Sequence, residues 1–295
     1  MTETSDIRRG MFYMIATCAV FAIQDGVSRH AAETVSVYMI VMLRFWFFAL
    51  LAGMWAARSN GGFRAAVRTA FPMLQALRAL LLISEICLIM FSFVRIGLIA
   101  THAVFICYPL IIAALSVPFL GETVGWRRWL AIVVGFVGVM VIINPGSAIL
   151  TPWTLVPLAC ATLFASYSLL TRYVARKDSA NVSFFWTGFC GAVIITPLGL
   201  LHWQPIAFAD AGWIAVLCLL AITGNWLLIK AYEAADASSI QPFSYLQFPF
   251  VSAVGLLVFG ETLGVNVLVG VAIVAGAGLF TLWRERVRAK ANPAS

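Results

Sequence analysis

Charged side chains are scarce in this 295-residue chain: Asp, Glu, Lys and Arg together make up 11% of it, whereas 62% is hydrophobic. A soluble domain carries roughly 25% charged and 45–50% apolar residues. No soluble core of this size could bury so much apolar surface, so lipid must be the main solvent of the folded chain. The shortage of charge therefore excludes an ordinary soluble protein.

The chain also lacks the short motifs of several enzyme classes. It has no H-E-x-x-H, no G-x-S-x-G, no paired carboxylates on one helix and no Walker A loop. We therefore predict that it is not an enzyme and does not hydrolyse ATP to drive transport. A channel is the weaker alternative, because channels usually line their pores with rings of repeated groups. These absences favour a secondary carrier.

Cysteine and histidine are too few and too scattered to suggest a cofactor. The six cysteines fall inside apolar runs without C-x-x-C spacing and are interpreted as small buried hydrophobes. The three histidines show no metal-ligand spacing, so no metal or other cofactor is predicted. The net charge of +7 comes from short basic clusters between apolar runs. That pattern is not typical of a nucleic-acid-binding face, and no nucleic-acid partner is predicted.

Long apolar runs are what the chain has in abundance. A helix needs about 20 apolar residues to cross the hydrocarbon core of a bilayer. Only helices satisfy their backbone hydrogen bonds alone in lipid, and the alternation of a membrane β-barrel is absent. The predicted fold is an all-α integral membrane protein with ten transmembrane helices. The predicted spans are 11–28, 35–57, 73–94, 97–118, 127–144, 153–173, 182–201, 211–230, 237–258 and 265–283.

Lysine and arginine are distributed unevenly between the connecting segments. Most lie in segments on the same side as the two termini, whereas Arg29 and Arg95 lie in the opposite loops, and Arg44 and Arg78 lie within spans. Because cytoplasmic loops are enriched in these residues, both termini are predicted to be cytoplasmic. The first apolar run is expected to be retained as a span rather than cleaved as a signal peptide, since many similar runs follow it.

The sequence Gly-Glu-Thr-x-Gly occurs twice, at 121–125 and at 260–264, each time after a long apolar run. Five predicted spans separate the two copies. Because five is odd, the two halves must lie upside down relative to each other. We predict two inverted five-helix repeats, residues 1–146 and 147–295. Such repeats are typical of secondary transporters, which bind substrate near the middle of the membrane where the halves meet.

Residues around the repeated motif carry a resemblance to a known family. They are Gly121-Glu122, Phe259-Gly260-Glu261, the matched Pro109 and Pro249, and the segment Ala231 to Phe250. With them the sequence resembles the EamA-type members of the drug/metabolite transporter superfamily over nearly its whole length. The resemblance implies a ten-helix, alternating-access carrier of small molecules in the bacterial inner membrane, which we expect to act as a monomer.

The substrate is less clearly indicated than the family. Members carry amino acids, nucleotide derivatives, other metabolites and drugs. The length and general pattern favour an exporter of amino acids, including aromatic ones. The alternative is an uptake or export carrier for another metabolite, such as S-adenosylmethionine, or for a cationic drug.

Polar and aromatic side chains recur on one face of the fourth and ninth predicted spans, with others in spans one, three, six and eight. These groups are costly in lipid, so we expect them to face an internal path that suits a small amphipathic solute. Ordinary helix packing is the alternative for each aromatic ring. The predicted substrate-binding residues are His102, Phe105, Tyr108, Tyr167, Trp226, Gln241, Tyr245, Phe248, Gln24 and Glu85.

Two carboxylates within spans are functional candidates, because a charge is costly to bury in lipid. Glu85 either helps to line the path or carries a proton, or it forms a packing ion pair with Arg78 or Arg44. Asp25 lines the outer vestibule, pairs with Arg29 one turn along the helix, or caps the loop.

Proton coupling is a further hypothesis. His102 is the candidate, because histidine as a residue type has an ordinary pKa near physiological pH. The alternative is a hydrogen-bonded histidine that serves only packing. Facilitated efflux without a coupled ion is compatible with the same residues.

Prolines and glycines mark bends, close packing and helix ends in the predicted spans. Four prolines are predicted hinges: Pro109, Pro118, Pro242 and Pro249. Glycines in spans five and ten are expected to allow close helix packing. Glu122 and Glu261 are interpreted as caps on the helix that follows each of them, with a gating contact at each membrane face as the alternative.

Overall fold

The computed structural model describes residues 3–58, 62–120, 126–143, 152–234 and 241–291. Every regular element in these ranges is helical, which confirms the predicted all-α fold. The first half contains α1 (Glu3–Thr34), α2 (Val37–Arg58), α3 (Gly62–Val67), α4 (Pro72–Ile96), α5 (Leu98–Phe105), α6 (Tyr108–Leu120) and α7 (Trp126–Ile143). The second half contains η1 (Pro152–Leu155), α8 (Val156–Val174), α9 (Ala180–Leu201), α10 (Phe208–Ala234), η2 (Gln241–Leu246), α12 (Gln247–Phe259) and α13 (Val265–Ala291).

The predicted spans fall on these helices with three differences. The fourth span is interrupted between α5 and α6, the ninth consists of η2 followed by α12, and the short α3 was not predicted. Six helical stretches among the described residues are long and apolar enough to cross a membrane, and three shorter apolar helices accompany them. The count of ten spans stays a prediction.

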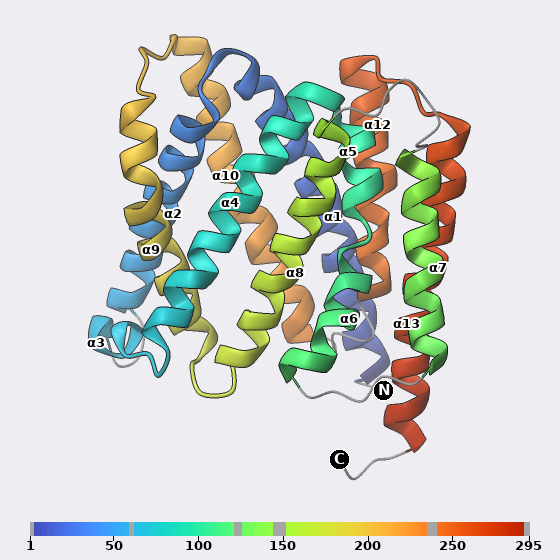
Figure 1. Ribbon diagram of the computed structural model, residues 1–295. Helices are drawn as coiled ribbons and strands as arrows, with labels where there is room; N and C mark the ends of the chain where they lie inside the picture. Colours follow the sequence, from blue (N-terminus) through green and yellow to red (C-terminus); the bar gives the residue numbers. More distant parts are fainter. Residues whose placement is uncertain (1–2, 59–61, 121–125, 144–151, 235–240, 292–295) are drawn as a thin grey trace.

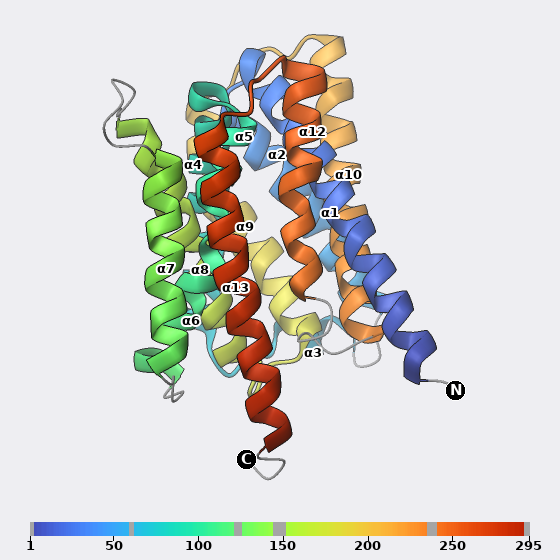
Figure 2. The same cartoon turned by 90° about the vertical axis from the view of Figure 1, so that its right-hand side faces the viewer.

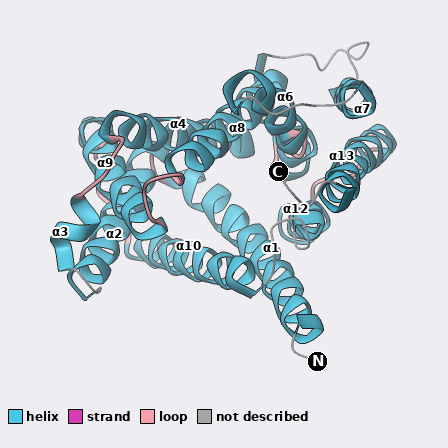
Figure 3. Cartoon of the chain, turned by 90° about the horizontal axis from the view of Figure 1, so that it is seen from below, coloured by secondary structure: helices cyan, strands magenta, loops and turns pink. Residues whose placement is uncertain are grey.

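The helices pack in a set of recurring pairs. α1 packs along α10 and α12, α8 packs along α4 and α6, α2 pairs with α9, and α7 pairs with α13. Figure 2 shows α7 and α13 side by side, and Figure 3 shows them at the opposite edge of the bundle from α2 and α9. The beginning of α1 and the end of α13 lie at the same end of the bundle (Figure 1), which we call the terminus end. The turn between α12 and α13 lies at the other end, the distal end.

Two apolar clusters form the interior. The larger one is centred on α5, α6 and α12 and contains fully buried Leu98, Cys107 and Val251. The second joins α2, α4, α9 and α10. Large apolar side chains such as Val137 on α7 and Leu257 on α12 stay exposed, which suits a lipid environment.

Glycines bring α7 and α13 together. A Cβ atom on Gly138 would lie 2.9 Å from the backbone oxygen of Gly270, and a Cβ on Gly270 would lie 2.7 Å from that of Gly138. Only the absence of a side chain permits this distance, as expected for small residues between membrane helices. The predicted close packing is confirmed at these two glycines.

Two of the four predicted hinge prolines mark helix beginnings. Pro109 and Pro249 lie in the first turns of α6 and α12, where proline breaks no intrahelical hydrogen bond. Pro109 therefore follows the break between α5 and α6, and Pro249 follows the change from the 3-10 helix η2 to α12. Pro118 lies inside α6 near its end, and the side chain of Pro242 lies outside the described residues. The hinge role itself stays a prediction.

Candidate functional site

A small cavity lies where the two interrupted helices meet, between the α5–α6 junction and the η2–α12 junction. Its volume is about 20 Å³, which is room for about one water molecule. Aromatic rings form much of its wall, and imidazole, phenol, hydroxyl and amide groups supply polar contacts. The lining residues are His102, Phe105, Ile106, Tyr108, Ser244, Gln247 and Phe248.

Asp25 on α1 brings a carboxylate to this cavity. Its Oδ2 atom lies 3.0 Å from Nε2 of His102, within ion-pair distance but without the angle of a hydrogen bond. The amide Nε2 of Gln247 donates a hydrogen bond of 3.4 Å to the same oxygen. α1, α5 and α12 are thus joined at one acidic group. The alternative pairing of Asp25 with Arg29 is not formed, because Arg29 pairs with Glu261.

A row of aromatic rings leads away from His102. The imidazole stacks on Phe93 at a centroid distance of 5.4 Å and meets the edge of Phe105 at 5.9 Å. Phe164 on α8 then lies 5.7 Å from Phe105 and 6.0 Å from Tyr167. These offset and edge contacts are favourable between aromatic rings, and they connect the cavity wall to α8.

The structure brings together only part of the predicted site. His102, Phe105, Tyr108 and Phe248 line the cavity, and Tyr167 lies at the far end of the aromatic row.

The other predicted residues lie elsewhere. Trp226 is half exposed on α10 and meets Tyr13 edge to face at 6.5 Å. Tyr245 packs against α13, where a Cβ on Gly278 would collide with its hydroxyl. Gln24 is buried on α1, and the side chain of Gln241 lies outside the described residues.

Arg78 does not form the predicted alternative ion pair with Glu85. Its Nε atom donates a hydrogen bond of 2.9 Å to Thr171, another guanidinium nitrogen donates to Gln75, and the guanidinium lies 5.2 Å from the ring centre of Tyr167. The guanidinium is therefore held between α4 and α8.

Glu85 is buried on α4, where the charges of Asp25 and Arg44 act on it. The second predicted alternative, a packing ion pair with Arg44, is not formed either, and Arg44 acts on Glu85 only through its charge. Since like charges repel, Glu85 and Asp25 also influence one another in this low-dielectric interior.

Gln247 and Phe164 are two of the cavity-associated residues that sequence reasoning missed; Ile106 and Ser244 are also absent from the predicted site. Gln247 comes two residues before Pro249, so its position at a helix beginning was a usable signal. Phe164 lies three residues before the predicted Tyr167, but nothing in the sequence indicates which face of α8 turns toward α5.

Metal-ligand chemistry has no support in the described part of the chain. No group of three or more His, Cys, Asp or Glu side chains there could hold a metal ion. The six cysteines are free and buried, as the sequence predicted.

Comparison with protein families decides the identity of the fold. Residues 8–144 and residues 151–283 each match the EamA-like transporter family. The chain belongs to this family. The EamA-family protein is therefore a multi-pass membrane protein that transports small molecules, and the prediction that it is not an enzyme is confirmed.

Two relatives of this EamA-family protein are named as transporters. It is 23% identical over 281 residues to an S-adenosylmethionine uptake transporter of Rickettsia prowazekii, covering 94% of this chain and 93% of the relative. It is 24% identical over 283 residues to a riboflavin transporter of Brucella anthropi, covering 92% and 98%. A solved crystal structure with 18% identity superposes with a TM-score of 0.62 over 97% of this chain and 99% of the other, which shows a shared fold.

Proposed function

We propose that this EamA-family protein is a secondary carrier for a small metabolite that combines a flat ring with a cationic or hydrogen-bonding group. The observation that carries the proposal is the contact of Asp25 with His102 beside a ring-lined cavity. The rings offer stacking surfaces, and the carboxylate attracts a cation. S-adenosylmethionine, the substrate in the name of one relative, has both a purine ring and a sulfonium cation.

Riboflavin, named for another relative, has a flat ring and many hydrogen-bonding groups and also fits this chemistry. Amino-acid export, which the general pattern of the sequence favoured, has no support from the relatives described above. Amino acids therefore enter the test as a second class of solute.

The size of the cavity supports transport by alternating access. A volume of about 20 Å³ is far below the roughly 300–1,000 Å³ of sites that enclose drug-sized ligands. The helices around His102 must therefore separate before a metabolite can bind. The interruptions before α6 and α12 supply helix ends at which such a movement can take place.

Helix packing supports a division of the carrier into two equivalent halves. Exchanging each helix with its counterpart in the other half turns the α1–α10 pair into the α8–α4 pair, and the α1–α12 pair into the α8–α6 pair. The α2–α9 and α7–α13 pairs are then unchanged. The two matches to the family agree with this division. Basic residues in turns at the terminus end, including Arg176 and Lys177, favour a cytoplasmic position for both termini.

A counterflow screen in proteoliposomes tests the proposal. The solutes are S-adenosylmethionine, riboflavin, aromatic amino acids and a quaternary ammonium cation, each with and without a pH gradient. We expect saturable uptake of a ring-containing solute that is stimulated by the same solute on the opposite side. Uptake that does not saturate and shows no such stimulation would indicate a channel. A response to the pH gradient would favour proton coupling over facilitated transport.

The carboxylate of Asp25 is the most direct target. In Asp25→Asn we expect uptake of a cationic solute to fall by about tenfold to a hundredfold, because a buried charge partner is lost. The matched control is Glu33→Gln, since Glu33 also faces a histidine, His30, at 3.8 Å but is exposed. Equal transport by Asp25→Asn and Glu33→Gln would contradict the assigned role of Asp25.

A further inference from the structure

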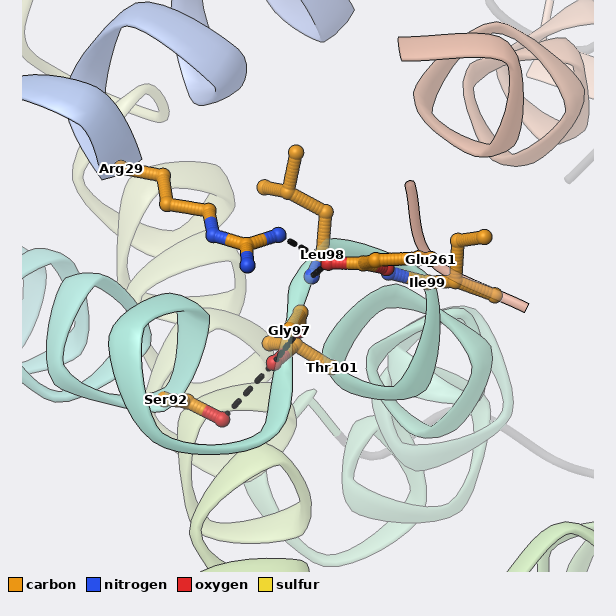
Figure 4. Close-up of polar contacts among 7 residues, drawn as sticks. All are labelled: Arg29, Ser92, Gly97, Leu98, Ile99, Thr101 and Glu261. Atoms are coloured by element: carbon orange, nitrogen blue, oxygen red, sulfur yellow. Dashed lines mark hydrogen bonds and ion pairs between the residues drawn. The ribbon is translucent and has the colours of Figure 1, made fainter. Parts of the chain in front are cut away.

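The carboxylate of Glu261 makes an unexpected contact at the distal end. Glu261 lies in the turn between α12 and α13, but its side chain binds the beginning of α5 (Figure 4). The backbone N–H of Leu98 donates to Oε1 at 2.7 Å, and that of Ile99 donates to Oε2 at 2.8 Å. The expectation that Glu261 caps the helix following it is therefore wrong. It caps a helix of the other half.

Arg29 completes this contact from α1. Its guanidinium forms an ion pair and a hydrogen bond with Oε1 of Glu261. The same guanidinium lies 4.1 Å from the ring centre of Phe259, at the end of α12. Both charged side chains are largely buried, at 16% and 13% exposure. One carboxylate thus joins α1 and α5 of the first half to the α12–α13 turn of the second.

Gly97 leaves the space that this carboxylate occupies. Its φ angle is +91°, which favours glycine, and a Cβ atom there would lie 2.5 Å from Oε1 of Glu261. Beneath it, the hydroxyl of Thr101 donates to the Gly97 carbonyl at 2.6 Å and lies 2.8 Å from the hydroxyl of Ser92. These bonds fix the corner between α4 and α5, so Glu261 meets a rigid partner.

The contact is directly connected to the cavity. α5 is only eight residues long, and it carries Leu98 and Ile99 at one end and His102 and Phe105 toward the other. On the opposite wall, α12 runs from the cavity residue Phe248 to the turn that holds Glu261. Separation of α5 from α12 on the distal side of the cavity would have to break the bonds to Glu261.

We propose that Arg29, Glu261 and the beginning of α5 form a latch that closes the carrier at the distal end and releases when the cavity opens toward that end. The latch rests on the alternating-access part of the proposed function and not on the identity of the substrate. A static cap on α5 would make the same bonds in every conformation of the carrier. The accessibility of the cavity from the distal end, rather than stability alone, therefore distinguishes a latch from a static cap.

Ser252 is the position for a reporter of distal opening. It lies on α12 one turn beyond Phe248 toward Glu261, and its side chain is buried with no hydrogen-bond partner among the described residues. Ser252→Cys is nearly isosteric. The introduced thiol is titrated with a membrane-impermeant methanethiosulfonate reagent, applied separately to each face of oriented membrane vesicles. The protein without Ser252→Cys measures the background from the six buried native cysteines.

In Glu261→Gln we expect the thiol to react about tenfold faster from the distal face, because loss of the charged contact shifts the population toward the open state. No acceleration is expected from the terminus face. Gly97→Ala should have the same effect, since its Cβ displaces the carboxylate without removing it. Gly62→Ala is the matched control, because Gly62 also has a positive φ, +63°, but a Cβ there meets nothing.

Arg29→Gln keeps the cap on α5 and removes only the cation, so a smaller acceleration of about threefold is expected. This milder variant keeps the test decisive if Glu261→Gln folds poorly. The latch is overturned if folded Arg29→Gln, Glu261→Gln and Gly97→Ala leave the distal reaction rate at the parent value. The thiol reaction is measured without any solute. Its outcome therefore does not depend on whether the counterflow screen identifies a substrate.

Discussion

The carboxylates of Glu261 and Asp178 lie at opposite ends of the bundle and make similar contacts with different consequences. Each comes from a turn in the second half and accepts backbone N–H bonds from the first half. Asp178 accepts from the N–H of Ala70 and the side chain of Gln75, both at 2.8 Å, and from the hydroxyl of Thr69. These donors belong to the corner before α4 and its first turn.

The two clusters differ in the helix that each one holds. Asp178 fastens the beginning of α4 to the α8–α9 turn through hydrogen bonds from neutral donors. Arg78 donates its hydrogen bond to Gln75 and acts on Asp178 through its charge. Glu261 fastens α5, which lines the cavity, and pairs directly with Arg29. Under the proposed latch, the Asp178 cluster serves mainly stability, whereas the Glu261 cluster controls the distal opening.

Asp178→Ala is expected to have the largest effect on stability. Thr69, Ala70 and the buried Gln75 would lose their common acceptor. Loss of three hydrogen bonds to one charged acceptor should destabilise the protein by about 2–3 kcal/mol. Thermal unfolding of the purified protein in detergent measures the loss.

The matched control is Asp210→Ala, an exposed carboxylate that accepts a hydrogen bond of 3.1 Å from Thr34. Its expected change is no more than about 0.5 kcal/mol. If Asp178→Ala also accelerated the distal reaction of the Ser252→Cys thiol as Glu261→Gln does, the proposed difference between the ends would be wrong.

Exchanging the two latch charges has a smaller expected effect on stability. In the double variant Arg29→Glu, Glu261→Arg, a guanidinium would face the N–H groups of Leu98 and Ile99, which need an acceptor. We expect a loss of about 1–2 kcal/mol and a distal thiol as reactive as in Glu261→Gln. Full recovery of both properties would mean that the ion pair alone matters and that the cap on α5 contributes nothing.

The effect of acid on Asp178, at the terminus end, should be the smallest. Burial raises the pKa of Asp178, but the hydrogen bonds from Thr69, Ala70 and Gln75 lower it further, so its pKa lies below the ordinary value. Its contribution to stability is therefore complete above about pH 3.9, the ordinary pKa of Asp, and is lost as the pH falls through the lower folded pKa. As the pH falls below about 3.9, the melting temperature of the unmodified protein should fall. The melting temperature of Asp178→Asn should fall less over the same pH range. Equal acid sensitivity in both proteins would contradict this assignment.

The sequence predicted what depends on local composition. Apolar run lengths located the helices, and the helical spacing on the fourth span predicted that His102 and Phe105 share one face, where both line the cavity. Pro109 also carried a signal for the interruption between α5 and α6, because the residue before a proline is disfavoured in helices.

Partners that are distant in the chain could not be predicted in this way. Asp25 has Arg29 one turn away, yet it contacts His102, because α1 packs against α5 and α12 with that face inward. Glu261 has the beginning of α13 nearby, yet it binds α5. In both cases the choice depends on which helices are neighbours, and periodicity within one helix does not contain that information.

The shortness of α5 has a consequence for selectivity. Aligned peptide groups give a helix a dipole, with partial positive charge at its first turn and partial negative charge at its last. The first turn of α5 is neutralised by Glu261, whereas the last turn ends at Phe105 beside the cavity. The negative end of that dipole therefore adds to the field of Asp25, so that main chain and side chain both favour a cation in the same small space.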